Sequence, residues 1–160
     1  MEATPRLINL FLLNKLPAAY ICGVRVEKIS NTECITAVKH RWINQNPFRS
    51  MYFAVQAMAA ELSTGALVLV EIKRSKAQIS MLVVANKAEF FKKATGKIIF
   101  TCKDGALISE TIQRAIQTNE GQLVWLKSTA VNDKGELVAE MEFQWSVKAK
   151  QTTQHPLNMP

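Results

Sequence analysis

A long apolar stretch in the first half of the chain restricts the folds that are possible. From Ser50 to Val70 the only charged side chain is Glu61. At about 100° per residue, a helix here would have almost no polar side, so the rest of the chain must wrap around it. Ser50 is a plausible N-cap for this helix. We therefore predict a central helix about 30 Å long.

Glu61 does not lie on the polar side of this predicted helix. Tyr52, Gln56 and Ser63 cluster on one side of the helical wheel. Glu61 falls opposite them, with the small and apolar residues Ala54, Ala57, Met58, Gly65 and Val68. Burial among such neighbours should raise the pKa of the carboxyl, which favours a role as a general base.

Length and cysteine content indicate an ordinary intracellular domain without a metal. A chain of 160 residues with 48% apolar content fills one core, which we assign to residues 1–148, with a polar tail at 149–160. Cys22, Cys34 and Cys102 are widely spaced and odd in number, so neither a disulfide framework nor a thiolate metal site is indicated. His40 is interpreted as an ordinary strand residue. We expect no cofactor and no metal, in a reducing cytoplasm.

The N-terminal apolar run and the basic charge limit the kinds of partner. The run from Leu7 to Leu16 is too short to span a bilayer, which needs about 20 apolar residues, and it lacks the pattern of a secretory signal. We predict a short buried helix that begins at Thr4 and Pro5 and stops at Pro17. The formal charge of +7 comes from scattered residues without a nucleic-acid motif. Neither a nucleic acid nor a membrane is expected as a partner, and an anionic small molecule carrying phosphates suits the charge.

The remaining segments predict an antiparallel sheet. Glu71 to Gln78 is a charged connector, and Ile79 to Asn86, apolar on both faces, is typical of the middle of a covered sheet. Lys87 to Thr95 places lysines around Phe90 and Phe91. Further strands are predicted at 22–30, 34–43 and 96–102, a helix at 106–117, and a hairpin at 122–131 and 136–148. Strands without regular alternation with helices indicate an α+β domain.

From Leu7 to Lys148, this order of elements resembles the hotdog fold, in which a curled antiparallel sheet wraps around one long central helix. Asn46, fifteen residues before Glu61, is similar to the arrangement in hotdog acyl-CoA thioesterases of the phenylacetate-pathway type. There an Asn precedes the helix and an Asp or Glu lies inside it. The N-terminal helix and the helix before the last hairpin are similar to an uncharacterised bacterial branch of that superfamily.

Two departures from the thioesterase pattern concern the start of the helix. Met51-Tyr52-Phe53-Ala54 stands where those enzymes have His-Gly-Gly, and Arg49 stands where the uncharacterised branch tends to have Gly. Backbone N–H groups still supply an oxyanion hole at a helix N-terminus. A bulky Phe53 could, however, plug an acyl channel.

Hotdog dehydratases provide a second comparison. Gln-Ala-Met-Ala at 56–59 resembles their Glu-Ala-Met-Ala, but the acid is replaced by Gln56, and no histidine lies between His40 and His155. The acid–base pair that dehydration needs is missing. This activity is therefore disfavoured.

The thioesterase resemblance implies roles for particular residues. Glu61 would be the general base or nucleophile, Asn46 would position the water or the carbonyl, and the amides of Phe53 and Ala54 would be oxyanion donors. The predicted substrate-binding residues are Arg49, Gln56, Lys73, Arg74 and Lys76. The resemblance also implies a homodimer or a dimer of dimers that hydrolyses an acyl-CoA or acyl-carrier thioester.

Structural roles stand beside these functional ones. Glu61 could pair with a lysine or arginine across a dimer interface, and Asn46 could serve as a turn residue before Pro47. Gln56 suits packing, and Lys73, Arg74 and Lys76 suit a solvated connector. The competing function is a non-catalytic hotdog domain that binds an acyl or aromatic ligand or serves in assembly.

Overall fold

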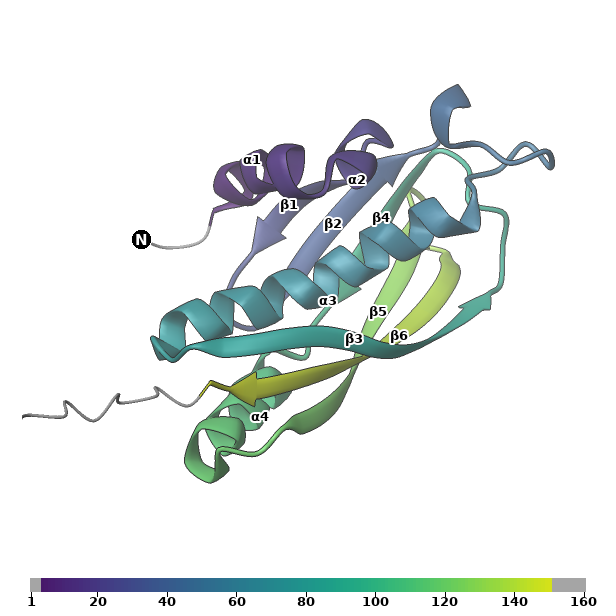
Figure 1. The fold of residues 1–160 in the computed structure, drawn as a ribbon. Coiled ribbons are helices and arrows are strands. Elements are labelled where there is room, and N and C mark those ends of the chain that lie inside the picture. The colour runs from purple at the N-terminus through teal and green to yellow at the C-terminus, as the bar shows by residue number, and fades with distance from the viewer. Residues whose placement is uncertain (1–3, 151–160) are drawn as a thin grey trace, which may run out of the picture.

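A curled antiparallel sheet packs around one long helix (Figure 1). The computed structural model describes residues 4–150. In chain order the elements are α1 (Pro5–Lys15), α2 (Pro17–Ile21), β1 (Arg25–Ile29), β2 (Cys34–Lys39), the 3-10 helix η1 (Trp42–Asn44), α3 (Phe53–Ser75), β3 (Ile79–Phe90), β4 (Lys97–Cys102), α4 (Gly105–Thr118), β5 (Gln122–Asn132) and β6 (Leu137–Ala149). The strand order is β1-β2-β4-β5-β6-β3, and neighbouring strands are antiparallel. This architecture confirms the predicted hotdog fold.

The core lies between α3 and the inner face of the sheet. Apolar side chains of the helix meet those of the strands, among them Ala59, Leu67, Val38, Phe100, Leu126 and Met141. Three polar contacts tie the helix to the strands. Thr36 Oγ1 donates to the Ala59 carbonyl (2.7 Å), Ser63 and Ser128 share a hydroxyl bond (2.8 Å), and Trp145 Nε1 donates to Thr64 Oγ1 (3.0 Å). The polar side of α3 is thus bonded inside the protein.

The central helix extends further than its apolar run. Helix α3 begins at Phe53, after Tyr52, and continues into the predicted charged connector as far as Ser75. Glu71 is 5% exposed, accepts a hydrogen bond from Ser109 Oγ (2.9 Å) and pairs with Arg74 (3.2 Å). These contacts with α4 and within the helix offset the desolvation cost of burying the Glu71 carboxylate. The prediction of a connector that begins at Glu71 was therefore wrong.

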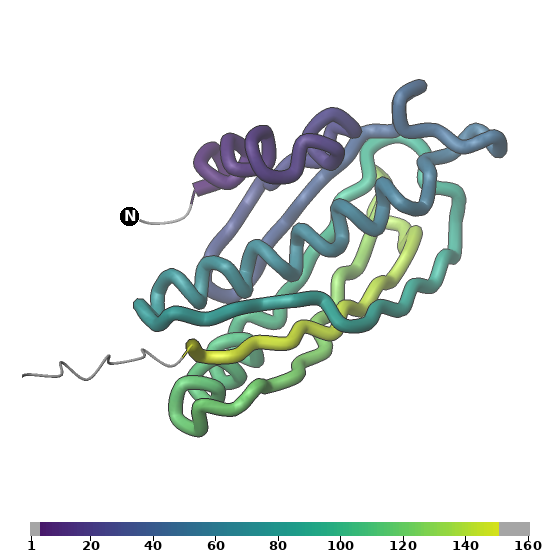
Figure 2. Tube along the Cα trace, in the orientation of Figure 1, coloured from purple at the N-terminus to yellow at the C-terminus, as the bar shows by residue number. Residues whose placement is uncertain are grey.

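By length and hydropathy, α3 is the one helix within residues 4–150 that could cross a membrane, yet most of its apolar window is buried inside the protein. The sheet curls around it in the tube view as well (Figure 2). It is the core helix of the domain.

Strand β3 lies at an edge of the sheet, so its predicted central position was wrong. It runs back along α3 and, within residues 4–150, pairs with β6 alone. Its inward side chains are partly buried, whereas Leu82 is 66% exposed and Val84 is 48% exposed. The two apolar faces that suggested a central strand therefore belong to a long edge strand.

The opposite edge of the sheet, β1, is covered by α1. Asn9 on this helix donates from Nδ2 to the Val26 carbonyl, and Asn9 Oδ1 accepts from the Val26 N–H, both at 2.9 Å. The side-chain amide therefore takes the place of a neighbouring strand. Helix α1 begins after Thr4 and ends at Lys15, and Pro17 then opens the short α2.

Other boundaries differ only slightly from those predicted. The second strand ends at Lys39, because Asn44 folds back to accept from Arg41 N (2.8 Å) and to donate to the Lys39 carbonyl (2.9 Å). The two Asn44 hydrogen bonds stabilise η1, and His40 lies just after the end of β2. The hairpin of β5 and β6 turns at Gly135 with a φ of 76°, as its sequence predicted. The predicted tail starts at Ala149, which is instead the last residue of β6, and its residues 151–160 lie outside the described residues.

Candidate functional site

The loop before α3 is built around the side chain of Asn46. Its Oδ1 accepts from Phe48 N (2.9 Å) and Ser50 N (3.2 Å), and its Nδ2 donates to Ser50 Oγ (3.1 Å). Arg49 in the same loop has a φ of 59°, the left-handed conformation that favours glycine. The turn role considered for Asn46 is present, and its amide closes the loop that leads into the helix.

The N-terminus of α3 offers unpaired backbone donors. Tyr52 caps the helix without a side-chain hydrogen bond. Its carbonyl accepts from Val55 N (3.0 Å) and Gln56 N (3.3 Å). Within the described residues the N–H groups of Phe53 and Ala54 have no acceptor, as expected for the first turn of a helix. With the positive end of the helix dipole, these two amides can bind a developing negative charge.

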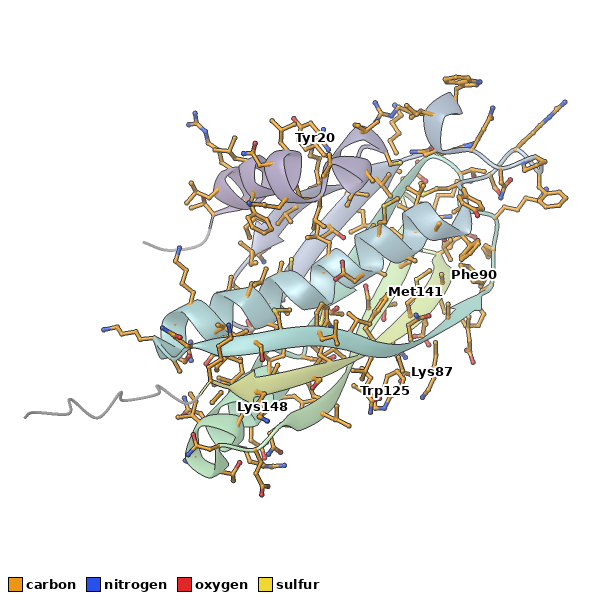
Figure 3. All side chains as sticks on the ribbon, viewed as in Figure 1. Tyr20, Lys87, Phe90, Trp125, Met141 and Lys148 are labelled. Carbon is orange, nitrogen blue, oxygen red and sulfur yellow. The ribbon has the colours of Figure 1, made fainter. Side chains whose placement is uncertain are left out.

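A pocket of about 380 Å³ opens beside this helix start. Its walls come from the loop, the first turns of α3 and the chain that follows β3, and they comprise Asn46, Phe48, Ser50, Met51, Phe53, Gln56, Phe90, Phe91, Lys92, Lys93 and Ala94. Figure 3 shows Phe90 on β3, near the end of α3 at which the helix begins. The half-exposed Phe53 packs edge-on against Tyr52, with ring centroids 5.0 Å apart, and leaves the pocket open.

Gln56 contributes a buried amide to the wall of this pocket. The residue is 5% exposed, and its Nε2 donates to the Met51 carbonyl (3.3 Å). Its Oε1 has no hydrogen-bond partner among residues 4–150. A buried acceptor without a partner carries a desolvation cost, which a donor on a bound ligand would remove.

Glu61 lies about two helical turns after Phe53, the first residue of α3. It is partly buried, and within residues 4–150 its carboxylate forms no hydrogen bond and no ion pair. Burial raises the pKa of the Glu61 carboxyl above its ordinary value. A Cβ atom added at Gly65 would lie 2.9 Å from Trp145 Cζ2 and 3.4 Å from Glu61 Oε1. The missing side chain of Gly65 therefore makes room for the indole ring beside the carboxylate.

One copy of the chain does not bring Glu61 to the oxyanion donors. Eight residues of helix separate Phe53 from Glu61, a rise of about 12 Å. Glu61 is not part of the pocket wall, whereas Asn46, Phe53 and Gln56 are. A reacting carbonyl needs its base and its donors within about 3 Å. Chemistry that uses both groups therefore requires a second copy.

The position of Glu61 indicates where that copy would join. Trp145, which packs against α3 next to Glu61, lies on β6 opposite Val83 of the edge strand β3. Glu61 thus lies on the side of α3 that borders the free edge of the sheet. A chain that pairs with β3 would approach this side.

The predicted phosphate-binding residues lie at the other end of the helix. Lys73 and Arg74 are about 30 Å along α3 from its start, and Arg74 pairs with Glu71 (3.2 Å). Lys76 follows as a left-handed C-cap with a φ of 57°. Within one copy none of the three faces the pocket, where the nearby cations are Lys92 and Lys93.

Phe90 and Phe91, for which the sequence predicted no site, belong to this pocket. These side chains, with Lys92 and Lys93, form the far wall of the pocket. They reach it because β3 continues four residues past the predicted end at Asn86 and returns to the start of α3. The cluster of lysines around phenylalanines was the available signal.

Two buried cysteines lie outside the wall of this pocket. Cys34 and Cys102 lie opposite each other on β2 and β4, and burial raises the pKa of both thiols to about 12. Such thiols are not nucleophiles near neutral pH. Across the described range 4–150, His, Cys, Asp and Glu form no group of three that could hold a metal ion.

The profile of one protein family, DUF4442, a domain of unknown function, matches residues 4–147. The chain belongs to the DUF4442 family. No curated protein matches it at a significant level. The matched range spans nearly every described element.

Solved structures share this fold across almost their whole length. PA5026 of Pseudomonas aeruginosa, a protein of unknown function and probable thioesterase, is 20% identical with a TM-score of 0.79, covering 93% of this chain and 99% of that one. A mutant of the P. aeruginosa thioesterase PA1618 is 12% identical with a TM-score of 0.72, covering 94% and 97%. The Haemophilus influenzae thioesterase HI1161 is 10% identical with a TM-score of 0.69, covering 97% of each chain. At these identities the similarity establishes the fold of this DUF4442 chain.

Proposed function

We propose that this protein is a thioesterase whose active site is shared by two copies of the chain. The observation that carries the proposal is the Glu61 carboxylate, which is partly buried, forms no bond within residues 4–150 and has a raised pKa. Hotdog neighbours named as thioesterases support the same class of reaction. The substrate would be an acyl-CoA or acyl-carrier thioester in the cytoplasm, and the assembly a homodimer or a dimer of dimers.

The proposed reaction divides its tasks between the copies. Glu61 of one copy takes a proton from water as the water oxygen attacks the thioester carbon. The Phe53 and Ala54 amides of the other copy donate to the resulting oxyanion, and the loop held by Asn46 positions them. When the carbon–sulfur bond breaks, the leaving thiolate takes from Glu61 the proton that Glu61 removed from water. The products are a carboxylic acid and a free thiol.

The proposal is tested by replacing Glu61 with glutamine. We expect Glu61→Gln to lower kcat for thiol release by about 10²- to 10⁴-fold, because the reaction loses its general base. The measurement is release of free thiol from a panel of short-chain, long-chain and aryl acyl-CoA thioesters. The control is Glu120→Gln, the same change in an exposed loop residue, which should leave turnover unaltered. Undiminished turnover in Glu61→Gln would end the assignment.

A binding protein without catalysis would give a different result in the same panel. The pocket with its aromatic wall and the unpartnered Gln56 Oε1 favours a bound ligand in either case. A binder would take up acyl-CoA, detected by calorimetry, and release no thiol. That outcome would favour the non-catalytic hotdog domain over the thioesterase.

A further inference from the structure

An extended apolar surface lies on the helices at the N-terminal end of the chain. We call it the N-terminal apolar surface, and its exposed members are Leu7, Leu10, Phe11, Leu13, Leu16, Ile21, Trp42 and Ile43. Trp42 is 82% exposed and Ile21 is 60% exposed. The two parts adjoin, because Asn44 at the end of η1 donates to the Cys22 carbonyl at the end of α2 (3.0 Å). Exposed apolar clusters of this kind mark sites of association.

Helix α1 buries little of its own apolar surface. Leu12 is its one fully buried residue, and Asn9 holds the edge of β1. At about 100° per residue, Leu7, Leu10 and Phe11 share the outward side of the helix. The prediction of a buried N-terminal helix was therefore wrong for this face, since Leu7 and Leu10 point outward while Leu12 and the polar Asn9 point inward.

A second copy joined at β3 would leave this surface uncovered. Strands β1 and β3 form opposite edges of the sheet. Helices α1 and α2 lie along the β1 side, across α3 from β3 (Figure 1). Pairing of two copies at β3 therefore provides no partner for the N-terminal apolar surface.

The charge around the surface is strongly positive. Residues 4–44, which run through the elements that carry the surface, contain six basic and two acidic side chains, a net charge of +4 in a chain with a total of +7. Both acids are already neutralised, because Glu27 pairs with Lys97 (2.7 Å) and Glu33 pairs with Lys28. No acid stands between Thr4 and Val26, where Arg6 and Lys15 flank the exposed leucines. A partner that complements this surface in both hydrophobicity and charge is apolar and anionic.

We propose that the N-terminal apolar surface docks on a membrane rich in anionic lipid. Leu10, Phe11 and their neighbours would enter the boundary between headgroups and acyl chains, with α1 in the plane of the bilayer. Arg6 and Lys15 would meet the anionic headgroups, and Trp42 would lie at headgroup depth. This proposal departs from the expectation of no membrane partner, which rested on the absence of a spanning segment at the N-terminus and did not consider binding at the membrane surface. The docking does not depend on the proposed hydrolysis.

The test is sedimentation of the full chain with vesicles. Vesicles of phosphatidylcholine mixed with phosphatidylglycerol should bind the protein, and vesicles of phosphatidylcholine alone should bind it at least about tenfold more weakly, because each headgroup-facing cation contributes about fivefold. Added salt should weaken the binding, since it screens these charges.

Two double variants separate the apolar and the electrostatic parts. Leu10→Ser with Phe11→Ser, and Arg6→Glu with Lys15→Glu, should each weaken binding to anionic vesicles by about tenfold or more. The matched controls are Leu123→Ser, an exposed leucine on β5, and Lys103→Glu with Lys134→Glu, exposed lysines elsewhere. The controls should bind within about twofold of the parent protein.

Three results would overturn the proposal. The first is no binding to anionic vesicles, and the second is binding that neither double variant weakens. The third is a smaller solution mass for Leu10→Ser with Phe11→Ser, which would show that a second copy covers the surface. If that variant fails to fold by circular dichroism, the charge-reversed pair and the salt dependence decide the question.

Discussion

For Glu61, the sequence and the structure indicate the same thing, a carboxyl with a raised pKa. The apolar wheel predicted a raised pKa, and burial next to Trp145 and Gly65 does raise it. The two fates considered for this carboxylate, catalytic base or interface ion, respond differently to pH. The difference follows from the sign of the pKa shift.

Glu61→Gln should change the pH dependence of stability. The folded protein holds the Glu61 proton more tightly than the unfolded chain, whose ordinary pKa is 4.5. The stability that this proton provides is present below that value and is lost as pH rises through the folded pKa. Thermal unfolding between about pH 4 and pH 8 should therefore show the parent protein losing Tm relative to Glu61→Gln.

The opposite trend would contradict the assignment of an unpaired carboxylate. An interface ion pair would lower the pKa of Glu61 in the dimer. The parent would then gain stability over Glu61→Gln as pH rises. Glu120→Gln serves as the control, with a Tm difference that stays constant across the series.

At the scale of elements, the first helix protects one edge of the sheet through a single side chain. Asn9→Leu should destabilise the protein by about 2 kcal/mol, because it leaves the N–H and carbonyl of the buried Val26 without partners. The measurement is urea unfolding. Asn14→Leu on the same helix is the control, since its exposed amide bonds only to the Leu10 carbonyl (3.2 Å). A loss no larger for Asn9 than for Asn14 would show that the strand edge does not need this cover.

Some elements could be predicted from the sequence, and others could not, for physical reasons. The central helix, the helix near residue 110 and the final hairpin each carry a strong period or turn signal. Strand β3 was misplaced because apolar residues on both faces indicate either a central strand or an edge that another chain covers. The role of Asn9 could not be predicted, since its partner Val26 is distant in sequence.

The candidate site was predicted only in part. Asn46, Phe53 and Gln56 do meet at one pocket, because all three lie within one local segment at the start of α3. The far wall could not be foreseen, since it depends on how far β3 runs before the chain turns. Glu61 was assigned to the same site by spacing along the chain. That spacing fixes how far Glu61 lies along the helix. It does not tell whether Glu61 serves the pocket of its own copy or that of a second copy.

At the scale of the whole molecule, β3 is the surface on which the shared site depends. Leu82→Lys with Val84→Lys should give monomers and abolish thiol release, because two copies joined at β3 would bring like charges together near their two-fold axis. Light scattering gives the mass, and the thiol assay gives turnover. Leu123→Lys, on the outer face away from the edge, should change neither. An unchanged mass would contradict assembly through this strand.

The two edges of the sheet differ, and this has a consequence for assembly. The β1 edge spans Arg25–Ile29, carries an irregular register near Val26 and is sealed by Asn9. The β3 edge spans Ile79–Phe90 and is open in the part of the chain that the structure describes. A chain with one open edge can join one other chain and then has none left to offer. Growth along the hydrogen-bonding direction therefore ends at a pair, and an amyloid-like ribbon cannot propagate from the native fold while Asn9 holds Val26.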